Sequence, residues 1–252
     1  MPFILRRAAA ASAVLAGVTA AAACGYLPGQ EDDAAPIADI ATERVSAENG
    51  LDKLDPAAAL GQVVQELEQA GSFHVSGTVK GGALDITYLV GEGATGTIGD
   101  AEGGASPVEM VAAAGQIYVA GDEAFLVETV GKDAAKTIGG KWLLLAEDSA
   151  SEFSVLADGQ KFAEAVFGNW TGEVETTGVR EVDGQQAIGF LFRETGSTLW
   201  VAASGDPRPL RFEEAGASGG EGVLKFDNIG AEVKLEVPQG DDVVDAENLQ
   251  SD

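Results

Sequence analysis

The chain has 252 residues, of which 41 are acidic and 15 are lysine or arginine, and its formal net charge is −26 at pH 7. A surface with this charge repels phosphate backbones, which excludes nucleic acid as a partner. The chain has one cysteine and one histidine, which excludes an internal disulfide and a zinc site built from several His or Cys ligands.

Residues 1–23 have the layout of a secretory signal peptide. Arg6 and Arg7 form a positive start, residues 8–23 carry no charge and are mostly alanine, and small residues end the segment. The uncharged run is shorter than the roughly 20 residues that a membrane-spanning helix needs. We therefore expect an export signal rather than a membrane span or a buried alanine-rich helix.

The only cysteine, Cys24, directly follows this segment. Residues 21–23 are all alanine and satisfy the rule for ordinary signal cleavage, and with Cys24 and Gly25 they also resemble a bacterial lipobox. A lipobox usually has a larger aliphatic residue in the place of Ala21. A diacylglyceryl thioether on Cys24 would account for the lone thiol, and two or more acyl chains anchor a protein stably. We expect a lipoprotein that is lipid-anchored to the cell membrane on its extracytoplasmic face.

The segment 24–55 is acidic and alanine-rich and has no sustained apolar period. It is predicted to be an acylated N-terminus followed by a flexible acidic tether. A helix is predicted to begin at Pro56, because Asp55 can cap it, and to end at Gly71. Its apolar residues recur at the spacing of one helical face: Leu60, Val63, Val64 and Leu67.

Alternation of apolar and polar residues predicts strands after this helix. The first two strands carry these apolar residues on one face each: Phe73, Val75 and Val79, then Leu84, Ile86 and Tyr88. Further strands are predicted at residues 94–99, 107–114 and 116–120. Residues 122–130 allow a short helix, and the segment GKWLLLAED allows a strand or an apolar connector.

A helical pair is predicted in the middle of the chain. Residues 149–152 fit a capping box ahead of Phe153 and Leu156. Asp158 can cap a second helix that ends at Gly168.

The last third of the chain is predicted to consist of strands, followed by an acidic C-terminal tail at residues 241–252. Gly184 marks the turn of a hairpin. The apolar faces of these strands are formed by Ile188, Phe190 and Phe192, by Leu210 and Phe212, and by Val233, Leu235 and Val237.

Roughly ten antiparallel strands and a few short helices predict an α+β fold. Most strands have one apolar face, which must be covered by helices or by the sheet itself. So few helices cannot cover so many strands. A curled sheet with part of its apolar face uncovered would therefore enclose a cavity.

The order of elements resembles that of LolA-like lipoprotein carriers and is most similar to the LppX/LprG-type lipoproteins of actinobacteria. The resemblance is carried by VREVDGQQAIGFLF, STLWVAASGDPRPLRFE and LKFDNIGAEVKLEVP, with support from AGQIYVAGDEAFLVE and GGKWLLL. It covers residues 56–240 and implies a half-barrel domain, a curled antiparallel sheet with a few helices packed on its concave face. Some members have a cavity for acyl chains, so the resemblance also implies lipid handling.

Catalytic and metal-binding motifs lack the surroundings that they need. His74 is expected on the polar side of a strand, and no G-x-S-x-G elbow is present. Residues 91–96 match G-x-G-x-x-G, but no helix follows to bind a pyrophosphate. The carboxylates are too numerous to single out a pair for glycoside hydrolysis, and no calcium loop of the D-x-[DN]-x-[DN]-G type occurs. We expect no enzymatic activity, no cofactor and no metal.

The apolar face of the strands is the remaining functional candidate. A cavity for a lipid or glycolipid would be lined by Leu84, Ile86, Tyr88, Ile188, Phe190, Phe192, Leu210 and Phe212. The same residues could instead form an ordinary dry core. We expect a monomeric lipoprotein that binds or shuttles a hydrophobic ligand. The alternative is a cell-surface interaction module that binds a protein or cell-wall partner through its acidic face.

Overall fold

A computed structural model describes residues 46–79, 82–100, 106–168, 170, 172–215 and 222–249 of the chain. The predicted signal peptide, Cys24 and the tether up to residue 45 lie outside the described residues. Contacts divide the chain into residues 1–43 and a second compact unit, residues 44–252. All the described residues belong to the second unit.

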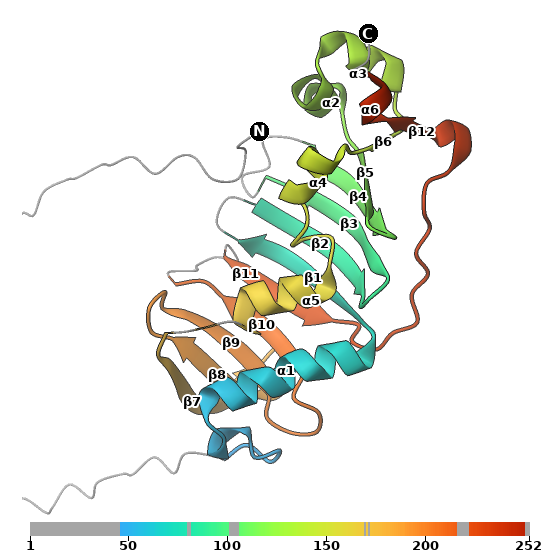
Figure 1. Cartoon of the computed structure of the whole chain (residues 1–252). Helices are drawn as coiled ribbons and strands as arrows, with labels where there is room; N and C mark the ends of the chain where they lie inside the picture. The colour runs from blue at the N-terminus through green and yellow to red at the C-terminus, as the bar shows by residue number, and fades with distance from the viewer. Residues whose placement is uncertain are drawn as a thin grey trace, which may run out of the picture. The chain divides into compact units, whose positions relative to one another are not determined.

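One open sheet of twelve strands has the order β12-β6-β5-β4-β3-β2-β1-β11-β10-β9-β8-β7 (Figure 1). The strands are β1 (Ser72–Val79), β2 (Gly82–Leu89), β3 (Gly93–Gly99), β4 (Val108–Ala113), β5 (Gln116–Ala120), β6 (Trp142–Leu144), β7 (Val174–Val182), β8 (Gln185–Phe192), β9 (Ser197–Ala202), β10 (Pro209–Glu213), β11 (Val223–Asp227) and β12 (Val243–Asp245). Neighbouring strands pair antiparallel except for β12 and β6, which pair parallel. The fold is α+β, as predicted, but the sheet is mixed rather than purely antiparallel.

Short helices accompany the sheet. They are α1 (Pro56–Ala70), α2 (Glu123–Val130), α3 (Lys132–Ile138), α4 (Glu147–Glu152), α5 (Gly159–Ala163) and α6 (Ala246–Leu249), with 3-10 turns η1 (Leu51–Lys53) and η3 (Gly240–Asp242) and a π-helical turn η2 (Glu164–Gly168). Helix α1 begins and ends where the sequence predicted. The Asp55 side chain accepts a hydrogen bond from the Ala57 amide at 3.0 Å, and Gly71 has the left-handed φ of 75° that ends the helix.

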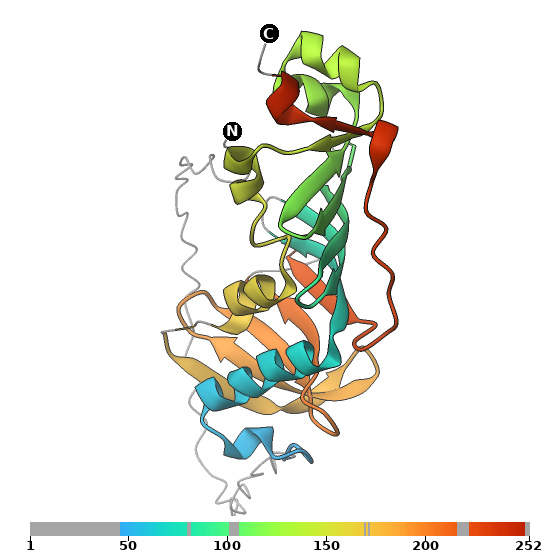
Figure 2. The same ribbon diagram turned by 45° about the vertical axis from the view of Figure 1, so that its right-hand side comes forward.

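Helices α1 and α5 pack on the same face of the sheet, which we call the inner face; the opposite face is the outer face (Figure 2). Strand register aligns the apolar inner-face residues into rows. One row runs from β1 to β6 through Val75, Ile86, Gly96, Met110, Val119 and Leu143. The main hydrophobic core lies between these rows and the helices.

The folded unit begins earlier than the predicted tether allows. Ala47 and Leu51 are buried, and Leu51 lies in the turn η1. The Asn49 amide nitrogen Nδ2 donates to the carbonyl of Ala202 at 2.8 Å, and the Asn49 backbone N–H donates to Ala203 at 3.1 Å. The boundary at residue 55 was therefore wrong for residues 46–55, because isolated apolar residues can dock a segment without producing a periodic pattern.

The predicted strand at residues 231–238 is extended but pairs with no strand among the described residues. Val233, Leu235 and Val237 are half-buried and the charged residues between them are exposed, so the predicted alternation of exposure is confirmed. A Cβ built on Gly93 would lie 3.1 Å from Leu235 Cδ2, which places Leu235 against the outer face. Alternating apolar and polar residues show only that one side of a segment is buried. Here that side is buried because the segment packs on the outer face of the sheet, not because it pairs as a strand.

The predicted C-terminal tail, residues 241–252, is structured over its described part, residues 241–249. Strand β12 pairs parallel with β6, with Val244 opposite Leu143, and Ala246 at the start of α6 is buried. Its acidic composition suggested a solvated tail. Val243 and Val244 are too short an apolar run to reveal a strand.

The middle of the chain differs from the prediction in where its helices begin. Residues 122–130 do form a helix, α2, capped by Asp122, and α3 was missed. Ser149 lies inside α4, so the capping box predicted there was wrong, and the chain forms turns rather than a helix through residues 153–157. Helix α5 is capped by Asp158, as predicted.

Candidate functional site

Seven of the eight predicted ligand-binding residues lie on the inner face and belong to the main core. They are Leu84, Ile86 and Tyr88 on β2, Ile188, Phe190 and Phe192 on β8, and Phe212 on β10. Strands β1, β11, β10 and β9 lie between β2 and β8 in the sheet. The seven residues therefore share a face and one core, but they lie in two groups separated by these strands.

The eighth residue, Leu210, faces the other way. Pro209 pairs with Val201 while Arg211 pairs with Trp200, so β10 carries one extra residue at this point. Such a bulge turns the extra side chain out of the regular alternation. Leu210 packs on the outer face against a small second cluster that contains Trp200, so it is not part of the candidate site.

The group on β2 is an aromatic stack beneath α5. Tyr88 lies between Phe73 and Phe162, with ring centroids 4.8 Å and 5.2 Å away. Phe73 and Tyr88 are directly opposite each other in the β1–β2 register. The register of that hairpin could have added Phe73 to the predicted site, whereas nothing in the sequence connects Phe162 with Tyr88.

Helix α5 rests closely on this stack. A Cβ built on Gly159 would lie 3.0 Å from Tyr88 Cβ and 3.1 Å from Phe73 Cε1. The Asp158 side chain caps the helix by accepting hydrogen bonds from the amides of Gln160 and Lys161, at 3.0 Å and 3.2 Å. Glycine at the first turn thus allows the helix to close over the aromatic rings.

The hydroxyl of Tyr88 is buried and has no hydrogen-bond partner among the described residues. Burial, and to a smaller extent the negative charge of Asp158, raise the pKa of this hydroxyl above its usual range. The phenol is therefore neutral and can donate a hydrogen bond. Buried hydroxyls normally have a partner, so this one is the chemically distinctive atom of the inner face.

The second aromatic group lies near the start of α1. Trp170 stacks on Phe192 with centroids 4.4 Å apart, and Phe192 is 6.3 Å from Phe212. A hollow of about 160 Å³ beside it is lined by Asp55, Pro56, Ala57, Leu60, Gly168, Trp170, Gly172 and Val174. None of the eight predicted residues lines this hollow. Its volume is below the roughly 300 Å³ at which ligand pockets begin, so an acyl chain would need further room.

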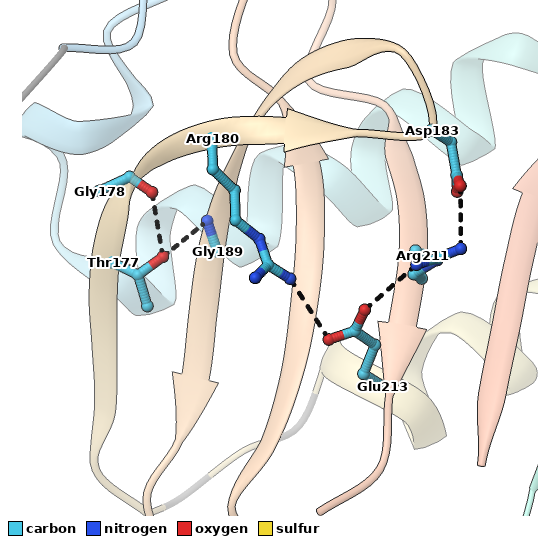
Figure 3. A network of polar contacts seen from close by, with 7 residues as sticks. All are labelled: Thr177, Gly178, Arg180, Asp183, Gly189, Arg211 and Glu213. Carbon is cyan, nitrogen blue, oxygen red and sulfur yellow. Dashed lines mark hydrogen bonds and ion pairs between the residues drawn. The ribbon is translucent and has the colours of Figure 1, made fainter. Parts of the chain in front are cut away.

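A polar network on the outer face holds the β7–β8 hairpin against β10 (Figure 3). Arg211 pairs with Asp183 at 2.9 Å and with Glu213 at 3.4 Å. Arg180 pairs with Glu213 at 3.5 Å. Two cations face two carboxylates, so the network is balanced in charge and does not offer an anion-binding site.

His74, the only histidine of the chain, lies on the outer face between two carboxylates. Its Nδ1 is 2.7 Å from Asp227 and its Nε2 is 3.0 Å from Asp85. Partial burial lowers the pKa of His74, but the hydrogen bonds and charges of the two carboxylates outweigh it, so the pKa is raised. Both ring nitrogens are engaged, which leaves neither free to activate a nucleophile.

The described residues contain no group of three or more His, Cys, Asp or Glu side chains placed to hold a metal ion. None of the helices in the described ranges is both long and apolar enough to cross a membrane. No protein-family model matches the chain, and no curated protein matches its sequence.

Proposed function

We propose that this chain is a LolA-like lipoprotein, anchored through Cys24 on the extracytoplasmic face of the cell membrane, which binds or shuttles a lipid or other hydrophobic ligand without catalysis. The observation that carries the proposal is the apolar inner face, which extends over β1 to β6 and over β8 to β11. Among the described elements, α1, α5 and η2 pack over its middle. Acyl chains gain about 25 cal/mol per Å² when they leave water for such a face.

An incompletely covered row of residues supports an entrance to this face. Val79, Ile98 and Val108 lie at the same end of β1, β3 and β4 and pack against the core, yet they are only half-buried. Ile98 pairs with Leu84 and with Val108 in the sheet register. The half-buried row therefore lies directly beside the predicted ligand residue Leu84, where an acyl chain could enter.

The second candidate is a surface interaction module. It is favoured by the burial of all seven predicted ligand residues on the inner face, which are 9% exposed or less. A sealed core would leave the acidic surface, with a formal charge of −26 for the whole chain, as the part that meets a partner.

Lipid extraction from the purified protein distinguishes the two candidates. The chain from residue 25 onward lacks the anchor and keeps the whole folded unit, so any lipid extracted from it by organic solvent and identified by mass spectrometry comes from the domain. For a carrier, we expect lipid in the wild type and less in Phe190→Trp, because the larger ring fills space on the inner face. Leu191→Trp, at the next residue on the outer face, is the matched control and should leave the lipid content unchanged.

A sealed core predicts a different result for the same variants. No lipid would be recovered from any of them, and Phe190→Trp would lower the free energy of unfolding by about 1–3 kcal/mol through overpacking. That result would overturn the carrier and favour the interaction module.

A further inference from the structure

The Tyr88 hydroxyl is poorly explained by packing alone. The residue is fully buried between Phe73 and Phe162, and phenylalanine would fill the same space without placing a hydroxyl in the core. This oxygen makes no hydrogen bond with any of the described residues. A buried polar atom without a partner calls for an explanation, and a bound group that accepts its hydrogen bond supplies one.

The charges around Tyr88 restrict what that partner can be. Asp158 directly precedes Gly159, which rests against Tyr88, and its negative charge contributes to the raised pKa of the hydroxyl. The Asp158 carboxylate is already held by the Gln160 and Lys161 amides. Lys161 Nζ lies 3.8 Å from Asp158 and is mostly exposed, so it offsets the negative charge only weakly. A second anion, such as a fatty-acid carboxylate, would be repelled here. A neutral carbonyl would not be repelled and could accept the phenolic hydrogen.

We infer that Tyr88 is the polar contact through which the inner face selects a ligand with a neutral carbonyl, such as an acyl ester, over one with a free carboxylate. This inference rests on the proposed function, since it requires a ligand on the inner face. Phe73 and Phe162 provide the apolar surface for the neighbouring hydrocarbon. Helix α5 rests on the Tyr88 side chain and the hydroxyl is buried, so the ligand reaches it when α5 moves away from the ring.

Three fluorescent polyene probes test this contact by titration. Diphenylhexatriene has no hydrogen-bonding group, cis-parinaric acid has a carboxylate, and its methyl ester has a neutral carbonyl. The protein is the chain from residue 25 onward, as wild type, Tyr88→Phe and Tyr118→Phe. Tyr118 is the matched control, because its hydroxyl lies on the outer face and donates to Gln116 Oε1 at 2.8 Å.

The wild type should bind the methyl ester more tightly than the acid. Tyr88→Phe should weaken ester binding roughly five- to tenfold, the effect of one lost neutral hydrogen bond, and leave diphenylhexatriene binding unchanged. Tyr118→Phe should change neither. Melting curves verify that all three proteins are folded.

Two other outcomes overturn the inference in different ways. If the wild type binds diphenylhexatriene and the ester, but Tyr88→Phe binds the ester equally well or the acid binds as tightly as the ester, Tyr88 does not select the ligand and the carrier proposal stands. If the wild type binds none of the three probes, the carrier proposal fails and the inference fails with it.

Discussion

The guanidinium carbon of Arg180 lies 3.6 Å from the centre of the Trp200 ring on the outer face of the sheet. Trp200 is almost fully buried there, and a Cβ on the neighbouring Gly189 would come within 2.8 Å of its ring. Gly189 also donates its amide hydrogen to Thr177 Oγ1 at 3.2 Å, at the point where the β7–β8 register shifts. The irregularity in β7 and the small size of Gly189 together allow Arg180 to close over the indole.

Replacing Arg180 with alanine should lower the free energy of unfolding by about 1 kcal/mol, since it removes the cation–π contact and the ion pair to Glu213. Arg193→Ala is the control, because Arg193 pairs with Glu175 on the surface and the structure records no ring contact for it. Its effect should stay within about 0.5 kcal/mol. Urea unfolding of both variants measures the difference, and equal losses would show that the indole contact adds nothing.

His74 should make stability depend on pH near neutrality. Ionised carboxylates accept hydrogen bonds only, so the bonds to both Asp85 and Asp227 require the charged imidazolium. The pKa of His74 is raised in the folded chain. Its contribution to the free energy of unfolding is therefore complete below the unfolded pKa of about 6.5 and is lost as pH rises through the folded pKa.

The chain has a single histidine, so the carbon-bound protons of one imidazole ring should report this titration directly by NMR. The midpoint should lie above 6.5, the unperturbed histidine pKa. The difference in unfolding free energy between wild type and His74→Gln should shrink steadily from pH 6 to pH 9 as the imidazolium loses its proton. A midpoint at or below 6.5 would contradict the two-carboxylate arrangement.

The sequence predicted which side of the sheet a residue lies on better than it predicted which strands pair. Alternation correctly placed Tyr88 and Phe190 on the side of the sheet that is buried by the helices, because the period of a strand fixes its two faces. The same rule failed at Leu210, where a bulge shifts the alternation by one residue. It also could not distinguish the unpaired segment 231–238 from a strand, since hydrophobic spacing carries no information about hydrogen-bond pairing.

The candidate site depended on contacts that are distant in sequence. Phe162 reaches Tyr88 only because α5 crosses the inner face, and the unpartnered hydroxyl becomes evident only when the surrounding atoms are placed. Composition and alternation contain no information about either. The apolar character of the site was therefore predictable, but the atom that distinguishes it from an ordinary core was not.

Cys24 should be acylated in the mature protein. Cys24→Ser should release the protein from membranes, because the chain would lose the acyl chains that hold it there. Detergent phase partitioning, together with mass spectrometry of the N-terminal peptide, measures both changes. An unmodified thiol at Cys24 of the mature wild type would contradict the lipobox interpretation and favour ordinary signal cleavage.

Strand β12 should be sensitive to a charge on one side only. Both valines of β12 are half-buried, but Val244 packs against the main core whereas Val243 belongs to neither core cluster. Val244→Asp should therefore lower the free energy of unfolding by about 1–3 kcal/mol, and Val243→Asp by clearly less. A solvated acidic tail would tolerate both changes equally, so matching unfolding curves for the two variants would argue against β12.

The same substitution, glycine to alanine, should have opposite effects in the two helices of the inner face. Gly61 in α1 is exposed and nothing lies within 4 Å of an added Cβ, so Gly61→Ala should raise the free energy of unfolding by about 0.5–1 kcal/mol through helix propensity. At Gly159 an added Cβ would press on Tyr88 and Phe73 from 3.0 Å and 3.1 Å, so α5 or the two rings must give by a few tenths of an ångström. The loss of packing should exceed the gain in propensity, which makes Gly159→Ala destabilising by about 1 kcal/mol.

If α5 is the helix that a ligand displaces, Gly159→Ala should also bind diphenylhexatriene faster in stopped-flow mixing, while Gly61→Ala should leave the rate unchanged. A stabilised Gly159→Ala with an unchanged rate would show that α5 neither rests tightly on Tyr88 nor controls access to it.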